Sequence, residues 1–381
     1  MRSPSSPSDA VVIVGGGFGG LFTALALQRR EPNCPIVLIE PRDRFLFLPL
    51  LYELLSDELQ SWEVAPRYNQ LLNNGICWIK DSVVGIEQTN QTIELAAGER
   101  LSWSQLVLAT GSKANDFGIP GVKEHSSGFR DLNDVRRLKQ WLNKLRQQRI
   151  EDAVLIIVGA GPTGVELACK LADLIEGAAS VRLVEMSDEI LPGSTAFNRE
   201  RAQAALERKG VLVQLNTSVS EVKSTTAVLA DGAVLRHSGL VWTAGSSPSI
   251  PAISPTPVLE RGRLAVEDDL RLVGCTNTFA LGDLSARSGS PWPASAQVAM
   301  QQGDATAAAI AKLRVKEEPQ PFQFEDRGEM LSLGVGDATL TGMGLTLAGP
   351  LAFQLRRATY VTRLPGLSLG LRSAGAWLLN R

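Results

Sequence analysis

The 381-residue sequence predicts an α/β fold with two parallel β-sheets. Two short apolar segments, 10–14 and 153–158, are each followed at once by a glycine-rich turn and a helix-forming segment. That pattern is typical of a buried parallel strand that enters a crossover helix. The composition agrees with a large core, since 44% of the residues are hydrophobic and 20% are charged. A net charge of −2 and a pI near 5.9 exclude a generally basic nucleic-acid-binding protein.

The first glycine-rich turn fits the G-x-G-x-x-G pattern with Gly15, Gly17 and Gly20. Gly15 allows the tight turn, Gly17 lets a pyrophosphate approach the backbone, and Gly20 lets the helix pack on the strand. A predicted helix and a second strand then lead to Glu40, 20 residues after Gly20, where a carboxylate can accept hydrogen bonds from a ribose. The segment is therefore predicted to form a Rossmann-like dinucleotide site; an ordinary glycine-rich turn is the alternative. The expected contact residues are Gly15, Gly17, Phe18, Gly19, Gly20 and Glu40.

A second complete fingerprint follows about 145 residues later, with Gly159, Gly161 and Gly164. Its second strand ends in Glu185, 21 residues after Gly164. Two fingerprints in one chain indicate two dinucleotides, such as a flavin and a nicotinamide, unless one copy is degenerate and empty.

Glu185 bears on the choice of nicotinamide. A carboxylate at this position suits the 2′-hydroxyl of NADH and repels the 2′-phosphate of NADPH. Arg182 lies close enough in the sequence to oppose this preference, although a solvated charge at the strand edge also explains it. NADH and NADPH both stay open at this point.

Three further strand endings complete the pattern. The segments 106–111 and 240–245 both end in Ala-x-Gly or Ala-Gly after an apolar run, and 278–283 ends in Gly-Asp. Asp283 would then lie at the carboxyl end of a strand, where it can accept hydrogen bonds from the ribityl chain of a flavin. The additional cofactor-binding candidates are Thr110, Gly111, Gly245, Gly282 and Asp283.

This order of motifs resembles the two-dinucleotide flavoprotein disulfide reductase superfamily, and it implies that fold. The sequence lacks the Cys-x-x-Cys pair of the disulfide reductases themselves. Residues 293–303 resemble the Ala-Gln-x-Ala-x-Gln motif of type II NAD(P)H:quinone oxidoreductases, and 45–51, 161–166 and 242–245 are similar to that family too. Leu48 and Tyr52 depart from it, since a Thr and a Pro are common there. The stretches 52–56 and 62–66 resemble the cyanobacterial and plastid branch, which includes demethylphylloquinone reductase.

The resemblance implies a non-covalent FAD, NADH or NADPH as co-substrate, and a lipophilic prenylated quinone, with demethylphylloquinone of vitamin K1 biosynthesis as one candidate. Glu166 matches the conserved glutamate of the family and would orient the nicotinamide or assist proton delivery. Gln297 and Gln301 are four residues apart on one helix face and would line a quinone pocket. Ala296 and Gln297 would also contact the flavin.

The motifs imply an interrupted domain arrangement. Residues 9–120 and 255–320 would form the FAD-binding domain, 121–254 the NAD(P)H-binding domain, and 321–381 a small C-terminal region. From position 338 onward there are five arginines and no acidic residue. Arginines interleaved with apolar residues and Trp377 suit an element in a membrane interface, and packing on the flavin domain or on a second subunit is the alternative. The expectation is a peripheral protein on the cytoplasmic side of a thylakoid or plasma membrane; the sequence leaves open whether it forms a homodimer.

Rival functions remain at this stage. A sulfide:quinone or ferredoxin-type reductase shares the expected fold, but sulfide chemistry needs cysteines near the flavin, and the four cysteines offer no obvious pair. A non-enzymatic NADH-sensing flavoprotein is the other alternative. With only two histidines and no cysteine cluster, no metal site and no nucleic-acid partner are expected.

Overall fold

The computed structural model describes residues 9–148, 150–289 and 291–379, which divide into two compact units. Unit 1 contains residues 9–46, 65–113 and 247–325, and unit 2 contains 47–64, 114–246 and 326–379. Unit 1 holds the first predicted fingerprint and unit 2 holds the second. Strands β8 (Ser112–Ala114) and β16 (Ser246–Pro248) each contain a point where the chain passes between units.

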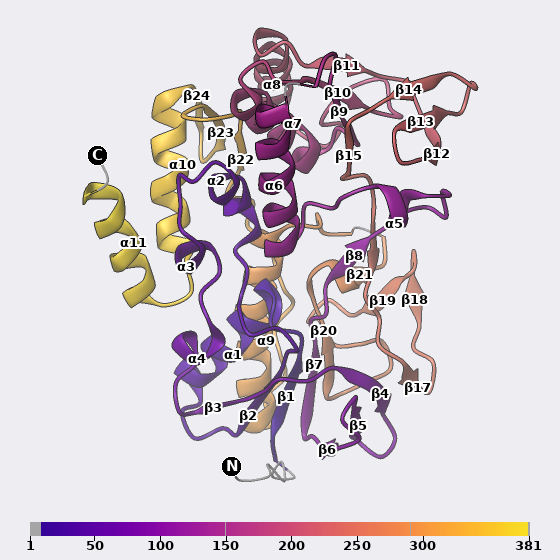
Figure 1. The fold of residues 1–381 in the computed structure, drawn as a ribbon. Coiled ribbons are helices and arrows are strands. Elements are labelled where there is room, and N and C mark those ends of the chain that lie inside the picture. The colour runs from indigo at the N-terminus through magenta and orange to yellow at the C-terminus, as the bar shows by residue number, and fades with distance from the viewer. Residues whose placement is uncertain (1–8, 149, 290, 380–381) are drawn as a thin grey trace. The chain divides into compact units, whose positions relative to one another are not determined.

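Unit 1 is built on a five-stranded parallel sheet in the order β20-β7-β1-β2-β3 (Figure 1). These strands are β1 (Val11–Val14), β2 (Ile36–Ile39), β3 (Ile76–Ile79), β7 (Gln105–Leu108) and β20 (Thr278–Ala280). All four residues of β1 are buried, as expected for an apolar central strand. Helices α1 (Phe18–Arg30) and α9 (Ala296–Arg314) pack against each other, and Gly303 allows this because a Cβ there would lie 2.7 Å from the carbonyl oxygen of Gly19.

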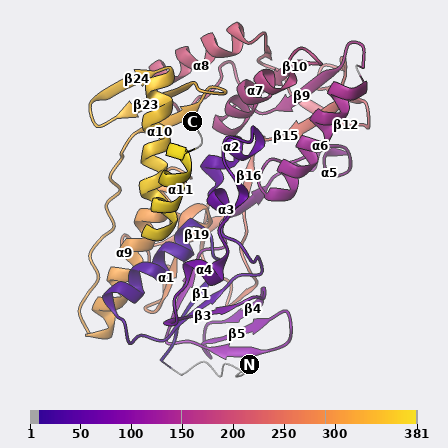
Figure 2. The same cartoon turned by 60° about the vertical axis from the view of Figure 1, so that its left-hand side comes forward.

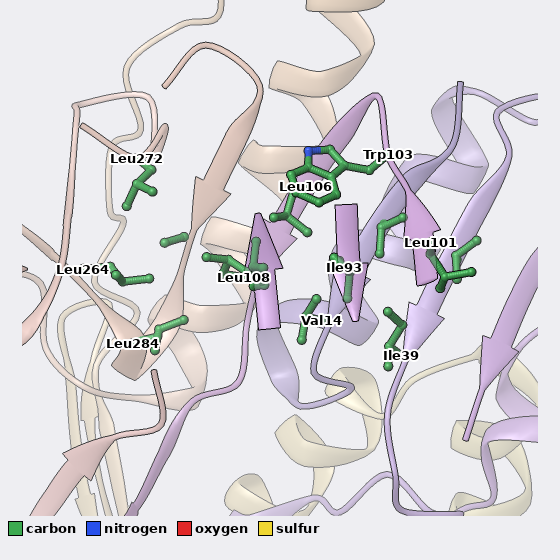
Figure 3. Close-up of a cluster of buried hydrophobic side chains, with 14 of the residues drawn as sticks. Val14, Ile39, Ile93, Leu101, Trp103, Leu106, Leu108, Leu264, Leu272 and Leu284 are labelled. Atoms are coloured by element: carbon green, nitrogen blue, oxygen red, sulfur yellow. The ribbon is translucent and has the colours of Figure 1, made fainter. Parts of the chain in front are cut away.

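Two smaller sheets complete unit 1. One has the order β17-β4-β5-β6, and the other has the order β18-β19-β21. Their side chains share one core with the parallel sheet, in which Val14 and Leu108 meet Ile93, Leu101 and Leu284 (Figure 3). The elements are β4 (Val83–Glu87), β5 (Thr92–Leu95), β6 (Arg100–Ser102), β17 (Ile253–Ser254), β18 (Leu259–Glu260), β19 (Arg263–Val266), β21 (Ser285–Arg287), α4 (Tyr68–Leu71) and the 3-10 helix η2 (Gly282–Leu284).

Unit 2 has a four-stranded parallel sheet in the order β11-β10-β9-β15. Helix α7 (Pro162–Ile175) follows the central strand, as the second fingerprint predicts, and contacts α6 and α8. An antiparallel sheet, β12-β13-β14, adds to the same core. The elements are β9 (Val154–Val158), β10 (Ser180–Val184), β11 (Leu212–Gln214), β12 (Val219–Val222), β13 (Thr226–Leu229), β14 (Val234–Arg236), β15 (Gly239–Trp242), α5 (Val122–His125), α6 (Leu132–Gln148) and α8 (Ala196–Arg208).

The C-terminal region forms a three-stranded antiparallel sheet and two helices in unit 2. Strands β22 (Glu329–Ser332) and β23 (Ala338–Gly342) contact α7 and α8, and β24 (Leu345–Ala348) completes the sheet. Helices α10 (Pro350–Arg363) and α11 (Leu367–Leu379) then lie side by side (Figure 2). This region therefore belongs to the unit that holds the second fingerprint.

Residues 47–64 also belong to unit 2, although the sequence assigns them to the predicted 9–120 domain segment. They form the 3-10 helix η1 (Leu48–Leu50) and helices α2 (Leu51–Leu55) and α3 (Ser61–Val64). Lys139 of α6 bonds Asp57, and Lys170 of α7 bonds Glu58 at 2.5 Å. These ion pairs attach the segment to the helices of unit 2, and we name it the acidic segment.

Candidate functional site

Unit 1 contains a glycine cradle at the carboxyl end of β1. Gly15 has φ +98°, and a Cβ there would lie 2.5 Å from the carbonyl oxygen of Ala109, so only glycine fits the turn. A Cβ on Gly20 would lie 1.8 Å from the carbonyl oxygen of Gly15, which explains the close packing of helix on turn. A Cβ on Gly17, in contrast, would meet nothing within 4 Å. The open side of the cradle is therefore at Gly17, where the pattern predicts the approach of a pyrophosphate.

The start of α1 suits an anion. Gly17 is the N-cap residue, no side chain caps the helix, and its first turn, which includes Phe18, has no acidic residue. The first N–H groups of such a helix and its positive dipole end attract a phosphate. Gly19 lies in the same turn, and a Cβ there would come within 2.0 Å of a methyl carbon of Leu281, so a larger residue would need that side chain to shift.

Glu40 lies at the end of β2 and is buried. Its carboxylate accepts hydrogen bonds from the backbone N–H of Gly16 at 2.8 Å and from the side chain of Arg42 at 2.7 and 2.9 Å. Burial alone would raise the pKa of Glu40, but the bonds from Arg42 and Gly16 lower it below its usual value. The residue is thus held as an anion beside the cradle, where a ribose is expected.

The sequence did not single out Gly16, Arg42 or Tyr68. The Tyr68 hydroxyl donates to the carbonyl oxygen of Gly16 at 2.7 Å, and this bond helps to hold the backbone of the glycine-rich turn in place. Arg42 could have been predicted as a partner of Glu40, because it follows Glu40 by only two residues. Tyr68 could not, because it is 52 residues away from Gly16 in the sequence.

Unit 1 also contains further cofactor-binding candidates, Thr110, Gly111, Gly282 and Asp283. Asp283 accepts a hydrogen bond from Ser112 at 2.7 Å, and Thr110 donates to the carbonyl oxygen of Ser249 at 2.6 Å. The backbone N–H of Gly282 donates to Gln302, a buried side chain of α9 that the sequence did not identify. Gly111 has φ +65° and lies between β7 and β8.

Helix α9 begins beside this group. Ser295 caps it by accepting from the N–H of Val298 at 3.2 Å, and Ala296 and Gln297 form its first turn. Gln301 uses its amide on the backbone of Glu325, donating at 2.9 Å and accepting at 3.0 Å. The structure thus gives Gln301 a part in holding the chain after α9, and its expected role in a quinone pocket stays a prediction.

Unit 2 repeats the cradle with matching residues. Gly159 has φ +102°, a Cβ on Gly164 would lie 1.8 Å from the carbonyl oxygen of Gly159, and Gly161 faces open space. Glu185 accepts from the N–H of Ala160 at 2.5 Å and from the N–H of Ser187 at 2.8 Å. These bonds correspond to those of Glu40 in unit 1, so each unit carries a complete dinucleotide cradle.

Two further residues that the sequence singled out near the second cradle, Arg182 and Gly245, have defined contacts. Arg182 donates to Gln214 at 3.1 Å, a contact across the sheet. Gly245 has φ +69°, and a Cβ there would lie 2.3 Å from the ring of Phe117, so glycine is required at this strand end.

Glu166, on the second turn of α7, belongs to a buried ionic cluster in unit 2. It is 7% exposed and accepts from the N–H of Ser332 at 2.7 Å. Arg356 of α10 and Glu53 of the acidic segment are both fully buried and form an ion pair, and one Arg356 nitrogen lies 3.7 Å from a Glu166 oxygen. The Tyr52 hydroxyl also bonds Glu166. The sequence pointed to no role in the site for Glu53, Arg356 or Ser332. Tyr52 and Glu53 appeared there only within the stretch 52–56 that resembles one branch of the family, and Tyr52 also as a departure from the family pattern.

Burial raises the pKa of Glu166 to about 7, and the nearby Glu53 carboxylate adds to the rise. Arg356, the Ser332 N–H and Tyr52 oppose it. A carboxyl group with a pKa near neutrality can both take up and release a proton under physiological conditions.

The burial of Arg356 corrects one expectation about the C-terminal region. This arginine is not available to a membrane interface, since its guanidinium lies inside unit 2 and over the Tyr360 ring at 4.8 Å. Arg357 and Arg372 stack on Trp377 and Trp62 instead. Within the described residues, none of the helices has the length and apolar character to cross a bilayer.

Comparisons with known proteins show the family and the fold of this chain. A family model described as "Pyridine nucleotide-disulphide oxidoreductase" matches residues 9–303. Demethylphylloquinone reductase NdbB of Synechocystis sp. is 38% identical over 97% of the chain and 98% of its own length. The type II NADH:quinone oxidoreductase Ndh of Mycobacterium tuberculosis is 28% identical over 97% and 87%. The structure of NDH2 from Plasmodium falciparum with NADH has a TM-score of 0.88, 17% identity and 98% coverage of both chains, so it shows a common fold.

Proposed function

Because the chain belongs to the pyridine nucleotide-disulphide oxidoreductase family, with the type II NAD(P)H:quinone oxidoreductases among its relatives, we propose that it is an FAD-dependent NAD(P)H:quinone oxidoreductase. The observation that carries this proposal is the pair of complete dinucleotide cradles, one in each unit. A protein that used a single dinucleotide would need only one.

The cradle of unit 1 is assigned to FAD. Its open position at Gly17, the uncapped start of α1 and the buried anion Glu40 suit the pyrophosphate and ribose of a dinucleotide. Asp283 and Ser112 supply the polar group expected at the ribityl chain. When bound, FAD accepts a hydride from a nicotinamide and passes two electrons to an acceptor.

The cradle of unit 2 is assigned to NAD(P)H, with Gly161 and the start of α7 at its pyrophosphate. Pro162 occupies the first position of that helix, where the missing N–H has no intrahelical partner to lose. Glu166 lies one turn further along α7, and its pKa of about 7 suits it to hold a proton for the reduction of a quinone.

The acceptor is proposed to be a prenylated naphthoquinone such as demethylphylloquinone. The support is the 38% identity, over nearly the whole length of both chains, to a protein named for that reaction. The four cysteines are free, and two of them, Cys34 and Cys169, are buried, which does not favour sulfide chemistry.

The experiment that tests this function uses the purified holoenzyme. We expect oxidation of NADH or NADPH with a naphthoquinone acceptor, faster than with a benzoquinone, and release of the yellow cofactor into the supernatant on acid precipitation. A long-lived charge-transfer complex with negligible turnover would indicate a nucleotide sensor instead, and bleaching of the flavin by sulfide would indicate a sulfide reductase.

The same assay measures the role of Glu185. Replacing Glu185 by glutamine removes the charge that repels a 2′-phosphate while keeping an oxygen for the N–H groups of Ala160 and Ser187. We expect the ratio of kcat/KM for NADPH to that for NADH to rise by about tenfold, which is roughly 1.4 kcal/mol of differential binding. An unchanged ratio would show that the carboxylate serves the loop backbone alone.

Contact with a membrane surface is proposed for the C-terminal helices and the adjoining hairpin. Leu351, Leu371 and Met343 are 61%, 65% and 87% exposed, and Arg357 and Arg372 stack on the tryptophans nearby. Exposed apolar side chains beside arginine and tryptophan suit a headgroup layer. Flotation with anionic liposomes tests this, and protein that stays at the bottom of the gradient would refute it.

A further inference from the structure

The buried ionic cluster of unit 2 contains two charged residues, Glu53 and Arg356, that have no role in the proposed chemistry. It has two carboxylates, Glu53 and Glu166, and one guanidinium, Arg356. One cation in a dry environment cannot neutralise two carboxylates, so the carboxylate that is farther from it binds a proton more readily.

The hydrogen bonds of Arg356 decide which carboxylate that is. One of its terminal nitrogens donates to Glu53, and the other donates to the carbonyl oxygen of Pro49 at 2.7 Å. Both acceptors belong to the acidic segment. Glu166 lies 3.7 Å from the second nitrogen, beyond hydrogen-bond distance, and its oxygen accepts from the Ser332 N–H instead.

We propose that Glu53 is a positioning residue that holds the guanidinium of Arg356 away from Glu166, and so leaves Glu166 able to bind a proton. The use of that proton in quinone reduction rests on the proposed function, whereas the effect of Glu53 on Glu166 does not. Glu53 is placed for this task because the acidic segment is attached on both sides of it, through Phe47 on Tyr360 and through the Glu58–Lys170 ion pair.

Lys170 lies one turn further along α7, but its charge is paired with that of Glu58. The buried hydroxyl and thiol groups near Glu166 carry no charge at neutral pH. Tyr52 of α2 and Tyr360 of α10 are buried, which raises the pKa of both hydroxyl groups above the usual value. Burial raises the pKa of the Cys169 thiol, on α7 itself, to about 12. Glu53 and Arg356 are therefore the charged neighbours that set the protonation of Glu166, and they act in opposite directions.

The test is Glu53→Gln in the holoenzyme. Glutamine keeps the shape and one acceptor for Arg356 but removes the competing charge, so Arg356 becomes the counter-ion of Glu166. In an infrared pH titration, the carboxylic-acid C=O band that disappears in Glu166→Gln should titrate at least about one pH unit lower than in wild type, which leaves roughly tenfold less protonated Glu166 at neutral pH. An unmoved band would overturn the proposal, even if activity fell.

Glu63→Gln is the matched control. Glu63 is also a buried carboxylate of the acidic segment, but it bonds Trp377 at 2.9 Å and lies outside the cluster. Its replacement should leave the band in place, and an equal shift there would show a general effect of the segment's charge and overturn the specific role of Glu53.

A second variant covers the case in which Glu53→Gln does not fold. The neutral pair Glu53→Gln with Arg356→Gln leaves Glu166 as the remaining carboxyl group of the cluster, and Glu166 can stay protonated, so the variant should fold. In this double variant the band should move above its wild-type pH, because the loss of Arg356 outweighs the loss of Glu53. A downward shift or none would contradict the proposal.

Stopped-flow reduction of a naphthoquinone by the reduced enzyme separates this inference from the proposed function. In Glu53→Gln the pH midpoint of kcat should fall by the same amount as the band, with KM unchanged. If the band moves and the rate profile does not, Glu53 still positions Arg356 and sets the protonation of Glu166, but Glu166 is not the proton donor to the quinone.

Discussion

Replacement of Arg356 by glutamine is expected to destabilise unit 2 by about 3–5 kcal/mol, because it leaves the fully buried carboxylate of Glu53 without its partner. One Glu53 oxygen already has no hydrogen-bond partner, so the loss cannot be absorbed by a second donor at hand. The variant also loses the bond to Pro49 and the contact with the Tyr360 ring. Calorimetry of the holoenzyme at pH 8 should show the unfolding temperature falling by on the order of 10 °C.

Two variants make this result specific. Arg372→Gln removes an exposed arginine of the same C-terminal region and should change stability by less than about 0.5 kcal/mol. The double variant Glu53→Gln with Arg356→Gln should recover most of the loss, since the pair then contains no unpaired charge. Equal melting of Arg356→Gln and Arg372→Gln would mean that the ion pair of Glu53 and Arg356 does not contribute to the fold.

The dinucleotide cradles could be predicted from the sequence because their requirements are local. Gly15 and Gly159 have a positive φ, which favours glycine. Gly20 and Gly164 lie against a backbone oxygen only five residues earlier, so six consecutive residues define each turn. The acids Glu40 and Glu185 follow at a fixed distance set by one helix and one strand. Both lie where the pattern places them, and ribose binding by them stays a prediction.

The ionic cluster could not be predicted, because its partners are far apart in the chain. Glu53 and Arg356 are separated by 303 residues, and each lies in a segment that reads as an ordinary amphipathic stretch. The five arginines after position 338 suggested a lipid-facing surface, but their number says nothing about which one points inward. Among the arginines of this region that the structure describes, Arg356 is fully buried, because α10 turns the side of Ala352, Phe353 and Tyr360 toward the core of unit 2.

The same limit applies to Gln301. Helical spacing correctly placed Gln297 and Gln301 on one helix, but it could not show that the Gln301 amide bonds the backbone of Glu325. A polar side chain on a helix face serves a substrate or a neighbouring loop equally well, and only the tertiary structure distinguishes the two.

Replacement of Glu166 by glutamine is expected to stabilise the protein at pH 8 and to slow quinone reduction. The pKa of Glu166 is about 7 in the folded chain, against an ordinary value of 4.5. A carboxyl group whose pKa is raised on folding binds more protons in the folded state, so its contribution is fully present below pH 4.5 and is lost as pH rises through 7. The shift corresponds to about 3 kcal/mol, an order-of-magnitude figure for a group with opposing neighbours.

Glutamine cannot ionise, and its carbonyl oxygen can still accept from the Ser332 N–H. The difference in unfolding free energy between Glu166→Gln and wild type should therefore be small at pH 5 and grow to a stabilisation of about 3 kcal/mol at pH 8, measured by denaturant unfolding across that range. Without a proton to deliver, the variant should reduce a naphthoquinone roughly 10²-fold more slowly, while the reaction with NAD(P)H stays nearly unchanged. A stability difference that does not vary with pH would show that Glu166 is ionised throughout, and its assignment as the proton carrier would then be wrong.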